Sequence, residues 1–273
     1  MPEQVIDGSD MDMQLHGRTA FVSGSTGGIG FAVASALSAE GVRVIVNGRS
    51  ATRVDAAVDR LRAAWPDSSP RGIVADFGDP ASVQRLLAEL DEVDVLVNNV
   101  GLFGLTAFPD IDDDEWQRYF DVNVMSGVRL SRHLLPGMLA RGRGRIVFIS
   151  SESGVAVPAD MVHYGTTKAA MIALANGLAK TTRGTGVTVN TVLGGPTYSD
   201  GVASAVEGIA SSQGAAVDEV KAAVIAQNRT TLLERFIEPS EIADMVTYLA
   251  SPRSSATNGA ALRVDGGVLT TTL

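Results

Sequence analysis

The sequence predicts a single-domain α/β fold, a doubly wound parallel sheet of about seven strands with helices on both faces. Three observations predict it. Short apolar, β-branched runs alternate with longer amphipathic stretches almost from end to end, as expected for right-handed βαβ units. Most of the short runs, such as VDVLV and RIVFIS, are nearly continuously hydrophobic, which is typical of parallel strands covered on both faces. No linker-like change of composition divides the 273 residues into two domains.

Strands and helices are expected in strict alternation. The strands are the short apolar runs 19–23, 43–47, 72–75, 93–97, 145–150, 187–192 and 260–264. The amphipathic segments between them predict helices over 29–40, 51–64, 80–90, 113–140, 163–183 and 239–250. Parallel strands need a long crossover connection, so each helix connects two successive strands.

Two segments interrupt the alternation. Residues 1–14 are expected to form a flexible tail ahead of one domain that covers residues 15–273. The stretch 197–233 is rich in Ala, Ser, Gly and Val, and it predicts one or two short helices. An insertion of that length is typical of a lid or a binding loop, so 197–233 is interpreted as a substrate lid; a peripheral decoration is the alternative.

The composition excludes several classes of function. With 22 Lys and Arg against 31 Asp and Glu, the net charge is −9, which argues against nucleic acid and membrane surfaces as partners. The absence of Cys excludes disulfides, thiolate zinc sites and a Cys nucleophile. The three His residues are scattered, and the acidic run 110–115 precedes a helix, where acids favour the positive end of the dipole. No metal site is therefore expected, with a site at 110–115 as the minor alternative.

Features of targeting or membrane insertion are also missing from the sequence. The first residues are acidic and contain no apolar segment of the secretory kind. No run approaches the roughly 20 apolar residues that a bilayer span requires. We therefore expect a cytoplasmic protein.

A glycine-rich turn follows the first strand and leads into the first helix, with Gly24, Gly28 and Gly30 spaced as G-x-x-x-G-x-G. Glycines allow a tight turn and a close approach of the backbone to a ligand. The helix N-terminus then offers free N–H groups and a positive dipole end to a pyrophosphate. The turn therefore predicts a dinucleotide site, although a turn that only joins strand to helix is the alternative.

The end of the second strand bears on the choice of cofactor. An acid there would bind the adenosine ribose of NAD, but the chain reads Val46-Asn47-Gly48-Arg49-Ser50. Arginine suits a phosphate because its planar fork donates paired hydrogen bonds and stays charged. Arg49 thus favours NADP(H) over NAD(H), with a solvated loop arginine as the alternative.

A possible catalytic group lies at the start of the fifth helix. Tyr164 and Lys168 are four residues apart, so they share one face of that helix. The phenol of Tyr has a pKa of about 10, and a nearby cation favours its phenolate. Ser151 ends the fifth strand, and ligands of open α/β sheets bind at the carboxyl ends of strands.

This combination resembles the short-chain dehydrogenase/reductase family, in its compact form and close in layout to the 3-oxoacyl-carrier-protein reductases, from Leu15 to Gly267. The resemblance implies a Rossmann-like sheet. The family's catalytic positions match Asn123, Ser151, Tyr164 and Lys168. With the glycine turn and Arg49, the matched positions give the expected cofactor contacts: Gly24, Ser25, Thr26, Gly28, Ile29, Gly30, Arg49, Asp76, Phe77, Asn99, Val100, Gly101, Tyr164, Lys168, Thr197 and Ser199.

The resemblance also implies a role for each catalytic residue. Tyr164 is expected to act as general acid in reduction and as general base in oxidation. Lys168 is expected to hold the nicotinamide ribose and to lower the pKa of Tyr164. Ser151 would hydrogen-bond the substrate oxygen, and Asn123 would anchor a water that connects Lys168 to solvent.

Three positions depart from the family pattern. Gly194-Gly195 stands where Pro-Gly is usual, and the loss of Pro frees the backbone dihedrals there. Gly27 stands where NADPH-using relatives often carry a basic residue. Val100 replaces the usual Ala, which is a mild change.

The substrate contacts are expected at Ser151, Glu152, Met161 and Tyr164. His163 either lines the same pocket or packs against a neighbouring helix. The segment 168–180 is apolar on almost every face, which indicates a second buried side against another subunit. The resemblance implies a homotetramer, and at least a homodimer.

Taken together, the sequence predicts an NAD(P)H-dependent oxidoreductase that acts on a carbonyl or secondary alcohol of a small to medium, partly apolar substrate. Reduction of a 3-oxoacyl thioester is one alternative. A non-catalytic NADP-binding sensor or scaffold is another, which the presence of all four catalytic positions disfavours.

Overall fold

The structure is a computed structural model that describes residues 12–227 and 230–272. A parallel sheet of seven strands lies at its centre, in the order β3-β2-β1-β4-β5-β6-β7, so the predicted doubly wound fold is confirmed. The order reverses between β1 and β4, which places a ligand crevice at the carboxyl ends of these two strands. The strands are β1 (Thr19–Val22), β2 (Arg43–Gly48), β3 (Arg71–Val74), β4 (Val95–Asn98), β5 (Arg143–Ser151), β6 (Gly186–Gly194) and β7 (Ala261–Val264).

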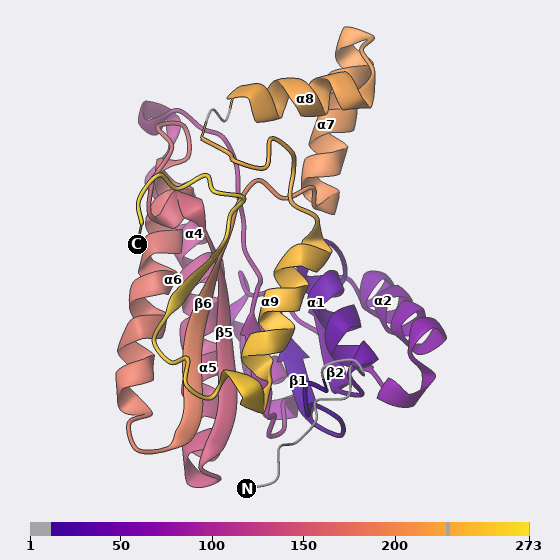
Figure 1. Cartoon of the computed structure of the whole chain (residues 1–273), viewed down its shortest axis with the longest axis vertical. Helices are drawn as coiled ribbons and strands as arrows, with labels where there is room; N and C mark the ends of the chain where they lie inside the picture. The colour runs from indigo at the N-terminus through magenta and orange to yellow at the C-terminus, as the bar shows by residue number, and fades with distance from the viewer. Residues whose placement is uncertain (1–11, 228–229, 273) are drawn as a thin grey trace, which may run out of the picture.

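Helices cover both faces of the sheet (Figure 1). Ala20 and Val22 of β1 point to the face covered by α1, α2 and α9, whereas Phe21 points to the face covered by α3, α5 and α6. All three side chains are fully buried, which explains why the strand is continuously apolar. The helices are α1 (Gly28–Ala39), α2 (Ala51–Ala64), α3 (Pro80–Glu89), α4 (Asp113–Tyr119), α5 (Met125–Ala140), α6 (Val162–Thr181), α7 (Asp200–Gln213), α8 (Val217–Gln227) and α9 (Pro239–Ala250).

One predicted helix differs from the structure. The segment 113–140 is not a single α-helix, because the π-helical turn Phe120–Val124 separates α4 from α5. This turn contains the buried Asn123, whose side chain bonds to the backbone of Leu102 and to Thr167. Periodicity cannot detect one inserted residue in a helix, and such bulges often occur at functional sites.

The acidic run before α4 has a structural role. Asp112 caps the helix by accepting a hydrogen bond from the N–H of Glu115 at 2.8 Å, and Asp113 and Asp114 lie in the first turn. Within the described residues, no group of three or more His, Asp or Glu side chains could hold a metal ion.

The segment 197–233 contains two helices, α7 and α8, which extend beyond the carboxyl end of the sheet (Figure 1, orange). They pack on each other through the buried Val206, Ala210 and Val220. Residues 228 and 229 lie outside the described residues.

The N-terminal segment, predicted as a tail, is described from residue 12 onward. The Oγ of Ser251 donates to the carbonyl of Met13 at 2.6 Å, and the Nε of Arg253 donates to that of Asp12 at 2.6 Å. No helix of the described residues is both long and apolar enough to span a bilayer.

The contact between α5 and the sheet yields a stability test. A Cβ on Gly127 would lie 2.6 Å from Cε1 of the fully buried Phe148, whereas a Cβ on Gly208 of α7 would meet nothing within 4 Å. Gly127→Ala should therefore lower the free energy of unfolding by about 1–3 kcal/mol, although Ala is the better helix former. Gly208→Ala is the matched control and should cost nothing. Equal melting temperatures of the two variants would contradict this packing.

Candidate active site

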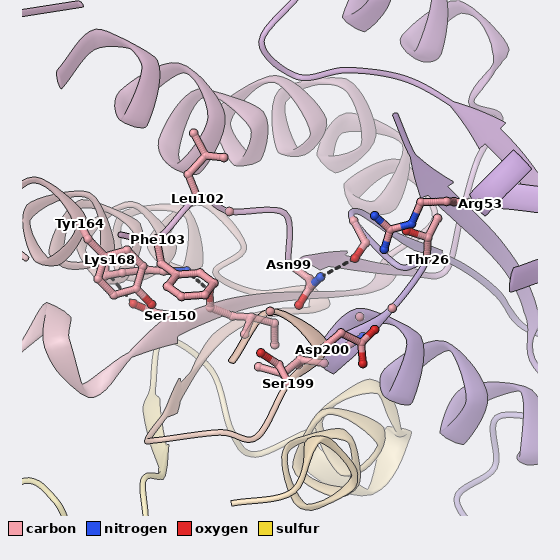
Figure 2. Close-up of a pocket in the computed structure, with 18 residues that line it drawn as sticks. Thr26, Arg53, Asn99, Leu102, Phe103, Ser150, Tyr164, Lys168, Ser199 and Asp200 are labelled. Carbon is pink, nitrogen blue, oxygen red and sulfur yellow. Dashed lines mark hydrogen bonds between the residues drawn. The ribbon is translucent and has the colours of Figure 1, made fainter. Parts of the chain in front are cut away.

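A cavity in two adjoining parts lies along the carboxyl ends of the central strands, and Figure 2 shows the inner part. Its inner part reaches from the glycine turn to Tyr164 and Lys168, and its outer part follows the loop between β2 and α2. The inner part is lined by Gly24, Thr26, Gly27, Gly28, Ile29, Gly30, Arg53, Asn99, Gly101, Leu102, Phe103, Ile149, Ser150, Tyr164, Lys168, Ser199, Asp200 and Gly201. The outer part is lined by Gly24, Thr26, Asn47, Gly48, Arg49, Ser50, Arg53, Ala75, Asp76, Phe77, Gly78, Asp79, Val100, Gly101, Leu102, Arg118 and Val122.

The glycine turn is as tight as the sequence predicts. Gly24 and Gly28 have φ angles of +62° and +53°, which favour glycine. A Cβ on Gly30 would lie 2.4 Å from the carbonyl oxygen of Gly24. Asn99 Nδ2 closes the turn by donating to the carbonyls of Ser23 and Gly24, at 2.9 and 3.0 Å. The end of β4 therefore fixes the turn that follows β1.

The N-terminus of α1 already holds an anionic group. The carboxylate of Asp200, in the first turn of α7, accepts the N–H of Gly28 at 3.0 Å. A helix N-terminus stabilises negative charge through its free N–H groups and its dipole. The turn can thus bind an anion, so its residues fit the pyrophosphate of a dinucleotide.

The outer cavity holds the predicted adenosine-side residues. Arg49, Asp76, Phe77 and Val100 all line it. Asp76 Oδ1 accepts the N–H of Gly78 at 2.8 Å, which shapes the loop after β3. The end of β2 therefore presents the guanidinium of Arg49 to the cavity, and this segment contains no Asp or Glu.

Tyr164 and Lys168 meet in the inner cavity, together with the end of β5 (Figure 2). Lys168 Nζ donates to the carbonyl of Ile149 at 2.9 Å and lies 5.5 Å from the ring centroid of Tyr164. Ser150 Oγ donates to the carbonyl of Lys168 at 2.9 Å. These two bonds attach the start of α6 to the end of β5.

Burial shifts the pKa values of both groups. It lowers the pKa of Lys168 to about 8, and the side chain is only 5 % exposed. Burial also raises the pKa of Tyr164, while the hydrogen bond with Ser151 opposes this rise. We expected a nearby cation to lower the pKa of Tyr164, but burial raises it, and the nearby groups Glu152 and Tyr119 act in the same direction.

Asn123 connects three parts of the site. Its Oδ1 accepts the N–H of Leu102 at 2.7 Å, and its Nδ2 donates to Thr167 Oγ1 at 2.9 Å. A Cβ on Gly101 would lie 3.5 Å from both Asn123 Oδ1 and Lys168 Nζ. Asn123 thus holds the loop after β4 against the face of α6 that carries the ammonium.

Ser151 contacts the buried carboxyl group of Glu152. Its Oγ donates to Glu152 Oε2 in a short hydrogen bond and accepts the N–H of Ser153 at 3.1 Å. Burial raises the pKa of Glu152, and the negative charge of Asp265 contributes in the same direction. The residue after Ser151 therefore adds a second polar group at this end of β5.

Six predicted residues are not among those that line these cavities in the described chain: Ser25, Asn123, Ser151, Glu152, Met161 and Thr197. Ser25 is fully buried, and its Oγ donates to the carbonyl of Val22 at 2.7 Å. Thr197 Oγ1 donates to the carbonyl of Gly195 at 2.9 Å, so it shapes its own loop. Glu152 and Met161 are absent from the residues that line the two cavities in the described chain.

Of the two alternatives for His163, the structure favours packing against a neighbouring helix. It is fully buried, with its ring 4.0 Å from that of Tyr119 and 6.2 Å from that of Trp116, centroid to centroid. It therefore packs against α4 and does not line the cavity.

Sequence reasoning missed several residues of the inner cavity, and three of them carry a charge or an aromatic ring. Arg53, Asp200 and Phe103 come from α2, α7 and the loop after β4. The only sequence signal is that Arg53 follows Arg49 by four residues, at the start of a predicted helix. Asp200 and Phe103 reach the site through the tertiary arrangement alone.

The comparisons with known proteins agree with this geometry. The family model described as short chain dehydrogenase matches residues 18–210. The uncharacterized oxidoreductase YvaG of Bacillus subtilis is 43% identical over 260 residues, which cover 95% of this chain and 98% of that protein. The 3-oxoacyl-[acyl-carrier-protein] reductase FabG of Escherichia coli is 32% identical over 260 residues, or 94% and 99% of the two chains. The structure of L-sorbose reductase from Gluconobacter frateurii, complexed with NADPH and L-sorbose, has a TM-score of 0.90 and 29% identity, and covers 96% and 100% of the two chains.

The buried ammonium of Lys168 yields a test by pH. Between its folded pKa of about 8 and the ordinary lysine pKa of 10.5, the unfolded chain binds a proton that the folded chain lacks. Raising the pH through this window therefore stabilises the wild type relative to Lys168→Met, by up to about 3 kcal/mol in total. Chemical unfolding of both proteins from pH 7 to 10.5 measures this difference.

The exposed Lys180 of the same helix supplies the control, because Lys180→Met should track the wild type at every pH. A wild-type advantage over Lys168→Met that stays constant from pH 7 to 10.5 would show that burial does not depress the pKa.

Proposed function

The chain belongs to the short-chain dehydrogenase/reductase family of oxidoreductases, and from this premise we propose that it is an NADP(H)-dependent enzyme acting on CH–OH donors or the corresponding carbonyls. Its substrate would be a small to medium, partly apolar ketone or secondary alcohol. One observation carries the proposal: Tyr164 and Lys168 line the same cavity as the glycine turn.

A nicotinamide bound in this cavity would supply or accept the hydride at the substrate carbon. Tyr164 gives its proton to the carbonyl oxygen in reduction and takes it back in oxidation. A phenol, whose ordinary pKa is about 10, holds a proton at neutral pH that it can donate in a reduction. Ser151, at the end of β5, would orient the same substrate oxygen.

Lys168 and Asn123 support Tyr164 and Ser151 by binding the cofactor and by positioning the neighbouring loop. A lysine whose pKa is about 8 remains largely charged at pH 7 and can hold ribose hydroxyls. A buried charge next to a cavity is costly, so its presence indicates a functional role. Asn123 fixes the loop that faces Lys168, and it would anchor the water that connects the ammonium to solvent.

The preference for NADP(H) is supported from two sides. Arg49 lines the outer cavity, and no carboxylate belongs to the end of β2. L-sorbose reductase, whose fold this chain shares, was solved with NADPH.

Apolar side chains around the opening support a partly apolar substrate. Phe103 lines the inner cavity and is 55 % exposed, and Leu105 follows it at 72 %. Val157, also exposed, approaches Gly165, the neighbour of Tyr164. Exposed apolar side chains that gather near a polar site are typical of a ligand-binding surface.

Substituting the phenol tests the mechanism. Tyr164→Phe should retain NADPH binding and lose at least about 100-fold in turnover, the scale of general acid–base catalysis. Initial rates at 340 nm and NADPH fluorescence titration measure the two quantities. Tyr248→Phe on α9 is the matched control and should keep full turnover. Turnover within a few-fold of wild type in Tyr164→Phe would refute the proton-transfer role.

The same assay, run over a panel, separates the alternatives. The panel contains 3-oxoacyl thioesters, cyclic and aromatic ketones, diketones and sugars, each with NADPH and NADH. Turnover of thioesters above free ketones would favour the 3-oxoacyl reductase alternative, which the similarity to FabG supports. Tight NADPH binding without turnover of any member would favour a non-catalytic sensor.

The outer face of α6 supports self-association, up to a homotetramer. Ala173 and Gly177 are small and exposed on this helix, and small residues allow a second helix to approach closely. Ala173→Glu should therefore lower the molar mass measured by light scattering to that of a smaller species. An unchanged mass would exclude this face as the interface.

A further inference from the structure

The hydroxyl group of Ser151 has one proton, and the neighbouring residue takes it. Ser151 Oγ donates to Oε2 of Glu152 and accepts the N–H of Ser153 at 3.1 Å. A serine hydroxyl offers one donor and two acceptor positions. While the carboxylate of Glu152 accepts the proton, Ser151 cannot donate it to the oxygen of a substrate. The role expected of Ser151 therefore depends on the protonation state of Glu152.

The same contact allows a hydrogen bond in the opposite direction. A protonated carboxyl group has an O–H donor, whereas an ionised one has none. With Glu152 protonated, its carboxyl group donates to Ser151 Oγ, and the N–H of Ser153 occupies the second acceptor position. The hydroxyl proton of Ser151 is then free for a ligand. This direction of the bond is the one that lets Ser151 hold a carbonyl oxygen.

The surroundings of Glu152 favour its protonated form. Burial raises the pKa of the carboxyl group, and the negative charge of Asp265 acts in the same direction. Hydrogen bonds from Ser151 and from the local backbone N–H groups oppose this rise without cancelling it. Within the described parts of the chain, Glu152 takes part in no ion pair. A carboxyl group that is shielded from water and lacks a cation partner is more stable when it is neutral.

The charged groups around this carboxyl group come from α6 and from the segment that includes β7. Lys168 Nζ donates to the carbonyl of Ile149 at 2.9 Å, and Arg263 is paired with Asp265 at 3.0 Å, so both cations bond to other groups. An ionised Glu152 would raise the pKa of Tyr164 and make the phenol a weaker acid. A neutral Glu152 therefore also suits proton donation by Tyr164.

We propose that Glu152 is a positioning residue for carbonyl reduction: its carboxyl group donates to Ser151 Oγ and thereby directs the Ser151 hydroxyl proton to the substrate oxygen. The proton of Glu152 stays on the carboxyl group throughout, and Tyr164 supplies the proton that the product alcohol gains. This inference rests on the proposed function, because it assigns a role beside the same site. It replaces the direct substrate contact predicted from the sequence, since Glu152 acts through Ser151.

The test replaces the carboxyl group by an amide and by a thioether. Glu152→Gln can donate to Ser151 at every pH, whereas Glu152→Met has a similar length and no donor. The value of kcat/KM is measured from about pH 5 to 9, with saturating NADPH and the panel compound that the wild type reduces fastest. Glu152→Gln should stay within about threefold of the wild type at the acid end, and Glu152→Met should be at least about tenfold slower throughout.

The pH dependence separates positioning from a merely structural role. Carbon-13 NMR of protein labelled at the glutamate carboxyl groups reports the ionisation of Glu152, whose resonance is the one missing from Glu152→Gln. The ratio of kcat/KM between the wild type and Glu152→Gln should stay near one while Glu152 is protonated. It should fall at least about tenfold where Glu152 is ionised, because Ser151 then donates to the carboxylate. The titrations of Tyr164 and Lys168 occur in both proteins.

Glu89→Gln, at the exposed end of α3, is the matched control and should follow the wild type at every pH. All rates are measured below the melting temperatures of the four proteins. Equal rates of Glu152→Met and Glu152→Gln would overturn the proposal. A ratio that stays near one where Glu152 is ionised would overturn it as well, and both results would leave the proposed function intact. A wild type that reduces no panel compound would overturn the proposed function itself.

Discussion

The candidate active site depends on one buried cation. The ammonium of Lys168 is bound to the carbonyl of Ile149, and Ser150 returns a hydrogen bond to the backbone of Lys168. These bonds join the start of α6 to the end of β5, which brings Tyr164 and Ser151 to one place. Burying this charge lowers the stability of the fold, as the lowered pKa shows. Costly buried charges of this kind cluster at functional sites.

The rest of the cofactor groove is a balance of opposite charges. The N-terminus of α1 attracts anions, and the carboxylate of Asp200 already accepts one of its N–H groups. Arg49 and Arg53 supply positive charge in the outer part of the cavity. A chain with a net charge of −9 thus concentrates cations where a polyanionic cofactor would bind.

The substrate end combines polar and apolar surface. Ser151 and Glu152 form a polar pair at the end of β5, while Phe103 and Val157 stay exposed near Tyr164. A site of this kind can hold one oxygen of the substrate by hydrogen bonds and the remainder by apolar contact. The helices α7 and α8 follow directly from this end, and Gly201 of α7 lies against the ring of Phe103.

The sequence by itself determined the elements and the motifs. Short apolar runs predicted all seven strands, and most of these runs are nearly continuous because strands covered on both faces carry no polar alternation. The glycine turn and the spacing of Tyr164 and Lys168 are local, so their geometry follows from their spacing. Only the tertiary structure decided the rest. The π-turn at Asn123 depends on bonds to Leu102 and Thr167, and Arg53 and Asp200 meet over Gly27 from helices about 150 residues apart in the chain. Such long-range contacts produce no periodic pattern in a sequence, because only the fold brings the residues together.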